Sequence, residues 1–271
     1  MRPVLLSVLG FDVQTYGLSK VLAAWMAALL LGRAFEQSGI NSRQQAYTLV
    51  LWSTVWGFVG AKLYYLLEHA PTLTMHDLGG MGFTWYGGFI GGALAAFVMV
   101  RRWQLPVGVV AGAAAAPLSV GYAIGRLGCL LAGDGTYGRP TTLPWGLTFP
   151  NRVVATDVPV HPTPLYEAIG ALAIAAVLWR LGRRTNGPTV FAWYLILTGG
   201  ARFLVEFLRT NAPVLLGFTQ PQLWALASVV GGCGLLVWSI RRAKRTASMG
   251  DPRVAFPTPG TVRPQATEAA R

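Results

Sequence analysis

Three charged side chains lie inside apolar stretches of the chain, where ligand chemistry would explain them. Arg126 follows a long run of apolar and small residues, and Arg202 lies in another such run. Glu206 is four residues after Arg202, so the two share one face of a helix. A guanidinium at membrane depth costs about 2.5–3.5 kcal/mol and usually faces a cavity with a function. Two such cations predict an anionic ligand, because guanidinium groups bind oxyanions with paired hydrogen bonds.

Composition indicates that a membrane surrounds these charges. The chain is 53% hydrophobic and only 12% charged, whereas soluble domains contain about 25% charged residues. The net charge of +12 suggests nucleic acid at first, but the cations cluster at the ends of apolar segments, so no nucleic-acid partner is expected. Cys129 and Cys233 lie in separate apolar runs without metal-site spacing. We therefore expect no metal site and no cofactor.

Seven apolar segments predict an all-α integral membrane protein with about seven transmembrane helices. The predicted spans are Leu18–Phe35, Gln45–Leu67, Tyr86–Val100, Val107–Leu131, Pro164–Leu181, Thr189–Phe207 and Gln222–Ile240. Connections rich in Arg and Lys alternate with connections that are poor in them. This alternation predicts that the N-terminus is outside and the C-terminus is cytoplasmic.

The connections also predict the domain organisation. Residues 1–245 form one transmembrane domain, and residues 132–163 within it form a small extracytoplasmic cap rich in Gly, Pro and Thr, with a strand near Val153–Val160. Residues 246–271 are polar and contain proline, which predicts a disordered cytoplasmic tail. No internal repeat is visible, which disfavours a transporter built from inverted halves.

A glycine-rich loop follows Arg126 and could bind phosphate. Gly125, Gly128 and Gly138 allow backbone amides to approach a ligand closely. Exposed amides beside Arg126 would form a phosphate cradle. The alternative is a capped helix end with one snorkelling arginine, and for Arg202 and Glu206 it is a buried structural ion pair.

The residues from Gly125 to Gly146 resemble the signature of the prolipoprotein diacylglyceryl transferases, bacterial membrane enzymes that lipidate a cysteine of lipoprotein precursors. Four further segments resemble family motifs in the same order, and the resemblance extends from about Tyr16 to Ile240. They are Tyr16–Leu18, Gly60–Tyr65, His161–Glu167 and Arg202–Arg209.

The resemblance implies an activity and its partners. The family transfers a diacylglyceryl group from phosphatidylglycerol to the lipobox cysteine thiol of prolipoproteins, releasing glycerol phosphate, as the first step of lipoprotein maturation. We therefore expect a multi-pass protein of the bacterial cytoplasmic (inner) membrane, with membrane lipid and a prolipoprotein signal peptide as partners. Arg126 and Arg202 match the family's functional arginines. They are expected to hold the phosphodiester, while Glu206 either holds Arg202 or acts on a proton.

The resemblance also implies a set of substrate contacts. The residues expected to contact substrate are Tyr16, Lys62, Gly87, Gly88, Gly125, Gly128, Cys129, Asp134, Gly138 and His161. Some have a structural alternative: Tyr16 could be an interface anchor, and Gly87 and Gly88 could serve close helix packing. His161 could be a structural residue at the start of its helix. Glu167, near the start of the same helix, is expected to be too shallow for catalysis.

Three positions depart from the family pattern. Tyr86 stands where the family has the histidine that is its natural base, Cys129 replaces an asparagine, and Asp134 replaces a glutamate. A tyrosine with a pKa of about 10 is a poor base at neutral pH. Thiolate formation is then assisted by the arginines, by Glu206, or by a tyrosine such as Tyr86. The alternative is a divergent, non-catalytic or differently specific phospholipid-binding membrane protein of the same fold.

Overall fold

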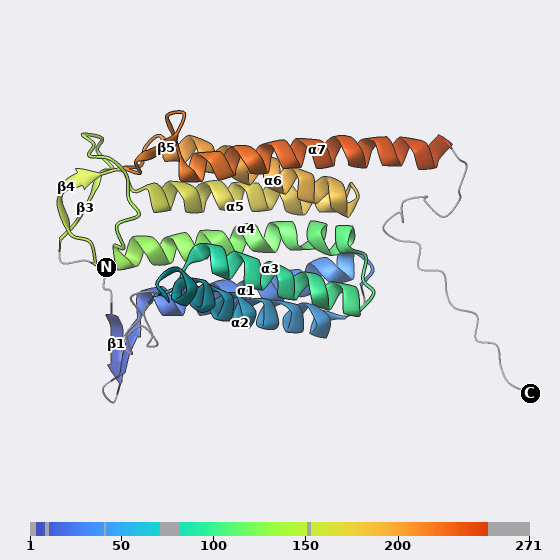
Figure 1. The fold of residues 1–271 in the computed structure, drawn as a ribbon, viewed down its shortest axis with the longest axis horizontal. Coiled ribbons are helices and arrows are strands. Elements are labelled where there is room, and N and C mark those ends of the chain that lie inside the picture. The colour runs from blue at the N-terminus through green and yellow to red at the C-terminus, as the bar shows by residue number, and fades with distance from the viewer. Residues whose placement is uncertain (1–3, 9–10, 41, 71–81, 151–152, 249–271) are drawn as a thin grey trace, which may run out of the picture.

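Seven helices run along one another in a bundle (Figure 1) in the computed structural model, which describes residues 4–8, 11–40, 42–70, 82–150 and 153–248. The helices are α1 (Thr15–Gln37), α2 (Arg43–Glu68), α3 (Trp85–Arg102), α4 (Val107–Ala132), α5 (Thr163–Gly182), α6 (Gly187–Glu206) and α7 (Gln220–Ser248). Six of them are long and apolar enough to cross a membrane, and α3, which ends in Arg101 and Arg102, falls outside that set. The chain is therefore an integral membrane protein.

The helices follow the apolar segments predicted from the sequence. The predicted spans overlap all seven helices, and their ends differ by a few residues at most positions. The largest difference is at α7, which continues to Ser248 although the span was predicted to end at Ile240. The first three residues of the predicted tail are thus helical, and residues 249–271 lie outside the described residues.

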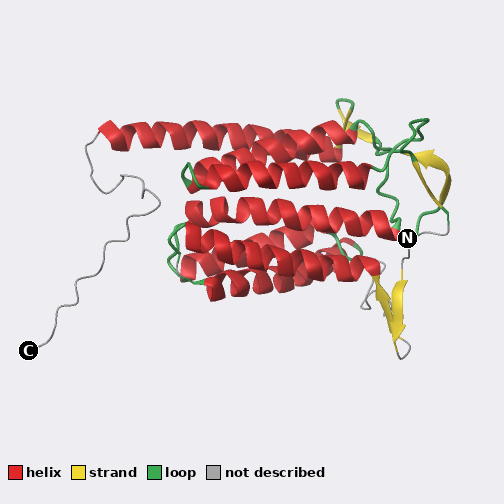
Figure 2. Cartoon of the chain, turned by 180° about the vertical axis from the view of Figure 1, so that it is seen from behind, coloured by secondary structure: helices red, strands yellow, loops and turns green. Residues whose placement is uncertain are grey.

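Three short antiparallel hairpins gather at one end of the bundle (Figure 2). They pair β1 (Val4–Val8) with β2 (Phe11–Gln14), β3 (Leu147–Phe149) with β4 (Thr156–Val160), and β5 (Pro213–Leu215) with β6 (Phe218–Thr219). The strand predicted near Val153–Val160 is present as β4 and begins at Thr156. The other strands were not predicted, because strands of a few residues are too short to show a clear alternation.

Helix α4 is the central element of the bundle. It packs against α1 on one side and against α5 and α6 on the other (Figure 1). At its start the approach to α6 is close: an ideal Cβ on Gly112 would lie 2.4 Å from Gly187 Cα. At its other end α4 stops at Gly133, which has a φ of 64° and forms a left-handed C-cap. Arg126 therefore lies in the last two turns of a helix that contacts both halves of the molecule.

The pair α2 and α3 is held together by glycines. An ideal Cβ on Gly60 would lie 2.4 Å from Gly87 O, and one on Gly87 would lie 2.2 Å from Gly60 O. An ideal Cβ on Gly88 would be 3.4 Å from Gly57 O. Real Cβ atoms do not approach backbone as closely as at Gly60 and Gly87, so these two positions exclude side chains. The geometry supports a packing role for Gly87, the alternative considered for it from the sequence, whereas a Cβ on Gly88 would make ordinary contacts.

The residues after α4 form a packed layer over the end of the bundle. The Tyr137 and Phe149 rings stack with centroids 4.5 Å apart, and both residues belong to a buried cluster with Leu130 and Val160. The Tyr137 hydroxyl donates a hydrogen bond to Val154 O. Burial raises the pKa of this hydroxyl above its ordinary value. This layer fixes the loop that adjoins Arg126.

Candidate active site

Glu167 is the centre of a charged cluster near the hairpin end of the bundle. Its carboxylate lies 3.1 Å from Arg126 Nε and 3.0 Å from Arg202 Nη1, so it joins α4, α5 and α6. The Tyr122 hydroxyl donates to Glu167 Oε1 at 2.7 Å. The Glu167 side chain is only 3% exposed. Glu167, which was expected to be too shallow for catalysis, lies one turn into α5 and is a buried member of the cluster. Pro162 and Pro164 at the start of α5 are also buried.

Glu206 is the second buried carboxylate of the cluster. Its Oε2 lies 2.8 Å from Arg202 Nη2, which is the predicted contact four residues along one helix. Its Oε1 accepts hydrogen bonds from Asn211 Nδ2 at 2.5 Å and from Thr219 Oγ1 at 3.0 Å. Glu206 therefore joins Arg202 to Asn211 and Thr219. This geometry favours a Glu206 that orients Arg202 over one that exchanges a proton.

Arg126 is oriented by a neighbour on its own helix as well as by Glu167. Its Nε donates to the Tyr122 hydroxyl at 2.9 Å, and its guanidinium carbon lies 4.9 Å from the centre of the Tyr122 ring. Tyr122 in turn donates to Glu167. The three side chains thus form a closed network that fixes the direction of the guanidinium group.

Arg209 joins this cluster to the loop after α4. Its Nη1 donates to Thr136 O at 2.5 Å and lies 4.0 Å from Glu167 Oε2, and its Nε lies 3.6 Å from Glu206 Oε2. Burial and the neighbouring Arg202 lower the pKa of Arg209 from its ordinary value, but arginine stays protonated in proteins. Arg209 is the last residue of the Arg202–Arg209 motif, but it was not among the predicted site residues. Its spacing of three residues after Glu206 was the available signal.

The charges of the cluster do not balance. Three arginines, Arg126, Arg202 and Arg209, face two glutamates. The side chains of Arg126 and Arg202 are 17% and 23% exposed, whereas those of Glu167 and Glu206 are 3% and 0% exposed. A ligand that approaches from outside therefore meets guanidinium groups and no carboxylate. The excess positive charge in apolar surroundings fits an anion with a single negative charge.

Lys20 adds a cation on α1 that sequence reasoning missed. Its Nζ lies 4.7 Å from the centre of the Tyr16 ring and would be 3.8 Å from an ideal Cβ on Gly125. An ideal Cβ on Gly128 would lie 2.0 Å from Ser19 Oγ. Gly125 and Gly128 therefore let α1 approach α4 beside Arg126. Tyr16, whose ring lies near Lys20 on α1, is on the same part of that helix. The signal in the sequence was a lysine within an apolar helix.

The predicted residues of the loop shape its backbone. Asp134 Oδ1 accepts from Thr136 N at 3.1 Å and from Thr136 Oγ1 at 2.6 Å, which fixes the turn that Arg209 contacts. An ideal Cβ on Gly138 would lie 2.4 Å from Leu208 O, and Gly138 N donates to His161 O at 2.9 Å. The His161 Nδ1 atom lies 3.4 Å from the Tyr166 hydroxyl. These contacts position the loop over the cluster.

Two further predicted residues have aromatic neighbours. The Tyr86 ring packs among the rings of Tyr64, Trp85 and Trp224, with centroids 5.4–6.4 Å apart. Lys62 Nζ lies 5.5 Å from the centre of the Tyr65 ring and 5.3 Å from that of Phe83.

Among the described residues, the ion pairs and hydrogen bonds that join Arg126, Arg202, Glu167 and Glu206 do not include Tyr86. Cys129 is a buried free thiol on α4, three residues after Arg126.

Known proteins are similar to this chain over most of its length. Residues 3–238 match the family model described as prolipoprotein diacylglyceryl transferase. A relative from Clostridium tetani is 31% identical over 216 residues, which are 77% of this chain and 86% of the relative. One from Azotobacter vinelandii is 32% identical over 266 residues, 90% of this chain and 97% of the relative. Both relatives are named phosphatidylglycerol–prolipoprotein diacylglyceryl transferase. The chain therefore belongs to the prolipoprotein diacylglyceryl transferase family.

Proposed function

We propose that the chain transfers a diacylglyceryl group from phosphatidylglycerol to the lipobox cysteine thiol of a prolipoprotein, the first step of lipoprotein maturation. The observation that carries this proposal is the charge excess of the cluster. Three arginines surround two buried carboxylates, and the guanidinium groups are the exposed part. Phosphatidylglycerol carries one negative charge on its phosphodiester, which would offset part of the excess positive charge of the cluster and Lys20.

The reaction follows from this arrangement. Arg126 and Arg202 bind the phosphodiester, and the cysteine sulfur attacks the adjacent carbon of the diacylglyceryl group. A carbon–sulfur bond forms, the carbon–oxygen bond to phosphate breaks, and glycerol phosphate leaves with the electron pair. The thiol proton passes to the departing phosphate, directly or through water. Negative charge grows on the phosphate in the transition state, so fixed guanidinium groups stabilise that state more than the bound substrate.

The glutamates act through the arginines. Glu167 and Glu206 are buried and bonded on both oxygens to cations or hydroxyl and amide donors. They hold the guanidinium groups in place before substrate binds, so little reorganisation accompanies the reaction. We assign them positioning roles and keep direct substrate contact for Arg126, Arg202, Tyr16 and Lys20.

The distribution of charged connections supports a site on the outer side of the membrane. We propose an outside N-terminus, a cytoplasmic C-terminus, and α3 as a seventh span in a bacterial inner membrane. The connections rich in Arg and Lys lie at one end of the bundle, and the hairpins and the loop after α4 lie at the other (Figure 1). The loop residues 133–162 then form an extracytoplasmic cap, and the lipobox of the signal peptide reaches the cluster from that side.

A phospholipid-binding relative without transferase activity is the second candidate. Tyr86 and Cys129 occupy positions where the family resemblance implies a histidine and an asparagine. The Tyr86 ring packs against Tyr64 and Trp224, and a tyrosine is a poor base at neutral pH, so the site would lack the base that the family resemblance implies. The substitutions Tyr86→His and Cys129→Asn distinguish the candidates, since a rise in transfer rate would indicate a degenerate enzyme.

The direct test uses the full-length protein in vesicles with acyl-labelled phosphatidylglycerol and a lipobox peptide. We expect label on the peptide cysteine with wild type, and a rate reduced about 10²–10³-fold by Arg126→Ala or Arg202→Ala. Arg33→Ala, an exposed arginine on α1, is the matched control and should keep the wild-type rate. A correctly inserted wild type that binds phosphatidylglycerol but transfers no label would refute the enzyme and leave the lipid-binding candidate.

A further inference from the structure

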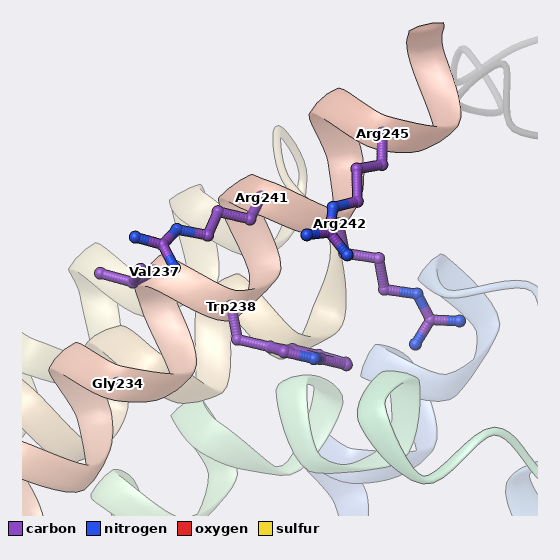
Figure 3. Close-up of a pocket in the computed structure, with 6 residues that line it drawn as sticks. All are labelled: Gly234, Val237, Trp238, Arg241, Arg242 and Arg245. Carbon is purple, nitrogen blue, oxygen red and sulfur yellow. The ribbon is translucent and has the colours of Figure 1, made fainter. Parts of the chain in front are cut away.

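A basic stripe follows one face of α7 at the end of the bundle away from the hairpins. The stripe consists of six residues that line a recess (Figure 3): Gly234, Val237, Trp238, Arg241, Arg242 and Arg245. Spacings of three and four residues place all six on one helix face. We refer to these six residues as the α7 stripe. It is separate from the charged cluster, which lies at the hairpin end.

The end of the bundle can be placed along α7 from its contacts with α6. The Ser239 hydroxyl is buried, donates to Asn186 Oδ1 at 3.0 Å and lies 2.8 Å from Thr189 Oγ1. Asn186 is the N-cap of α6, so Ser239 is level with the beginning of that helix. From there α7 continues to Ser248, roughly 13 Å at about 1.5 Å per residue. The arginines of the α7 stripe, which follow Ser239 in the chain, therefore lie beyond the N-terminal end of α6.

Polarity changes along the α7 stripe in one direction. Gly234 and Val237 are exposed and apolar, and no atom lies within 4 Å of an ideal Cβ on Gly234. Trp238 follows with 48% exposure, and the Arg242 guanidinium carbon lies 5.2 Å from the centre of its ring. Tryptophan is enriched where hydrocarbon meets water. The order from apolar groove to indole to guanidinium matches the order from acyl chain to headgroup in a phospholipid.

Two cations of this stripe, Arg241 and Arg245, also differ from those of the charged cluster. Arg126, Arg202 and Arg209 are each paired with a buried glutamate. Within the described ranges, no ion pair joins Arg241 or Arg245 to a carboxylate. An anion that binds between these arginines would supply the missing charge.

We propose that the α7 stripe binds an anionic phospholipid of the leaflet opposite the charged cluster. Its phosphate lies among Arg241, Arg242 and Arg245, and one acyl chain lies along Gly234 and Val237. The site requires a membrane-anchored headgroup, because the apolar half of the stripe contributes to binding. It takes no part in the transfer reaction.

The test uses Trp238 as a local reporter. The full-length protein is reconstituted in phosphatidylcholine nanodiscs that contain an equal mole fraction of either brominated phosphatidylserine or brominated phosphatidylcholine. The Trp238 signal is the difference in fluorescence between wild type and Trp238→Phe. Phosphatidylserine is chosen because it is anionic and is not the proposed substrate, so the result does not depend on transferase activity.

We expect the brominated anionic lipid to quench the Trp238 signal more strongly than the brominated zwitterionic lipid. Each arginine near an anionic surface contributes about fivefold to local binding, so replacing all three with glutamine should remove the preference. The control Arg101→Gln with Arg102→Gln changes two exposed arginines that end α3 and should retain it. Millimolar inorganic phosphate should leave the signal unchanged.

Three results would overturn the proposal. Equal quenching by the two lipids would show that the stripe has no preference for an anionic headgroup. A preference retained in the triple variant would place the selectivity outside these arginines. A Trp238 signal quenched by neither lipid would show that another occupant, such as residues 249–271 of the chain, covers the stripe. Transferase activity measured in parallel should be unaffected by the triple variant.

Discussion

Glu167→Gln tests whether the charged cluster works as one unit. The substitution keeps the size of the side chain and an oxygen that accepts from Tyr122, but it removes the negative charge between Arg126 and Arg202. Three buried guanidinium groups then face only Glu206. Both the stability of the protein and the position of the two arginines should change.

The contacts of Glu167 set the magnitude. Removing one partner of a buried ion pair costs about 3–5 kcal/mol. The arginines are 17% and 23% exposed, which favours the lower part of that range, and the retained hydrogen bond offsets about 1 kcal/mol. We expect a loss of about 2–3 kcal/mol in the free energy of unfolding. Displaced catalytic groups lose about 10²-fold in rate.

The measurements are thermal unfolding in detergent and the initial rate of label transfer to the lipobox peptide, with phosphatidylglycerol varied. Glu68→Gln, the same substitution at an exposed position near the end of α2, is the control and should change neither quantity. The expected signature is a reduced kcat with a smaller change in KM, because the arginines act mainly on the transition state. A Glu167→Gln protein with the wild-type rate and stability would refute the positioning role.

Three further substitutions probe other contacts. Arg209→Ala removes the hydrogen bond to Thr136 O and should speed proteolysis of the loop after α4 while reducing transfer; unchanged cleavage would contradict this role. Lys20→Met should lower kcat about tenfold, less than the ~10²–10³-fold expected for a fully buried donor, and an unaltered kcat would exclude Lys20 from the site. Gly60→Ala should destabilise the protein by about 1–3 kcal/mol, because its Cβ would meet Gly87 O at 2.4 Å. Gly170→Ala, with open space around it, is its control in thermal unfolding, and equal melting temperatures would contradict the packing argument.

The helical framework could be predicted because it depends on local sequence. Long apolar segments separated by polar connections are sufficient to predict α1 to α7 within a few residues, except at the end of α7. The hairpins β1–β2 and β5–β6 were missed, since their strands are too short for a periodic pattern. The pair Arg202 and Glu206 was predicted because both lie on one helix, four residues apart.

What the sequence alone determined is therefore the membrane-spanning class, the helix limits, the family motifs and the contacts between neighbours on one helix. Only the tertiary structure decided that Glu167 lies between Arg126 and Arg202, and that Arg209 closes the cluster onto the loop. It also decided that the Tyr86 ring packs against Trp224 of α7. The physical reason is that the burial and charge balance of a side chain depend on which helices pack together. Those contacts join residues far apart in the chain, and no local pattern encodes them.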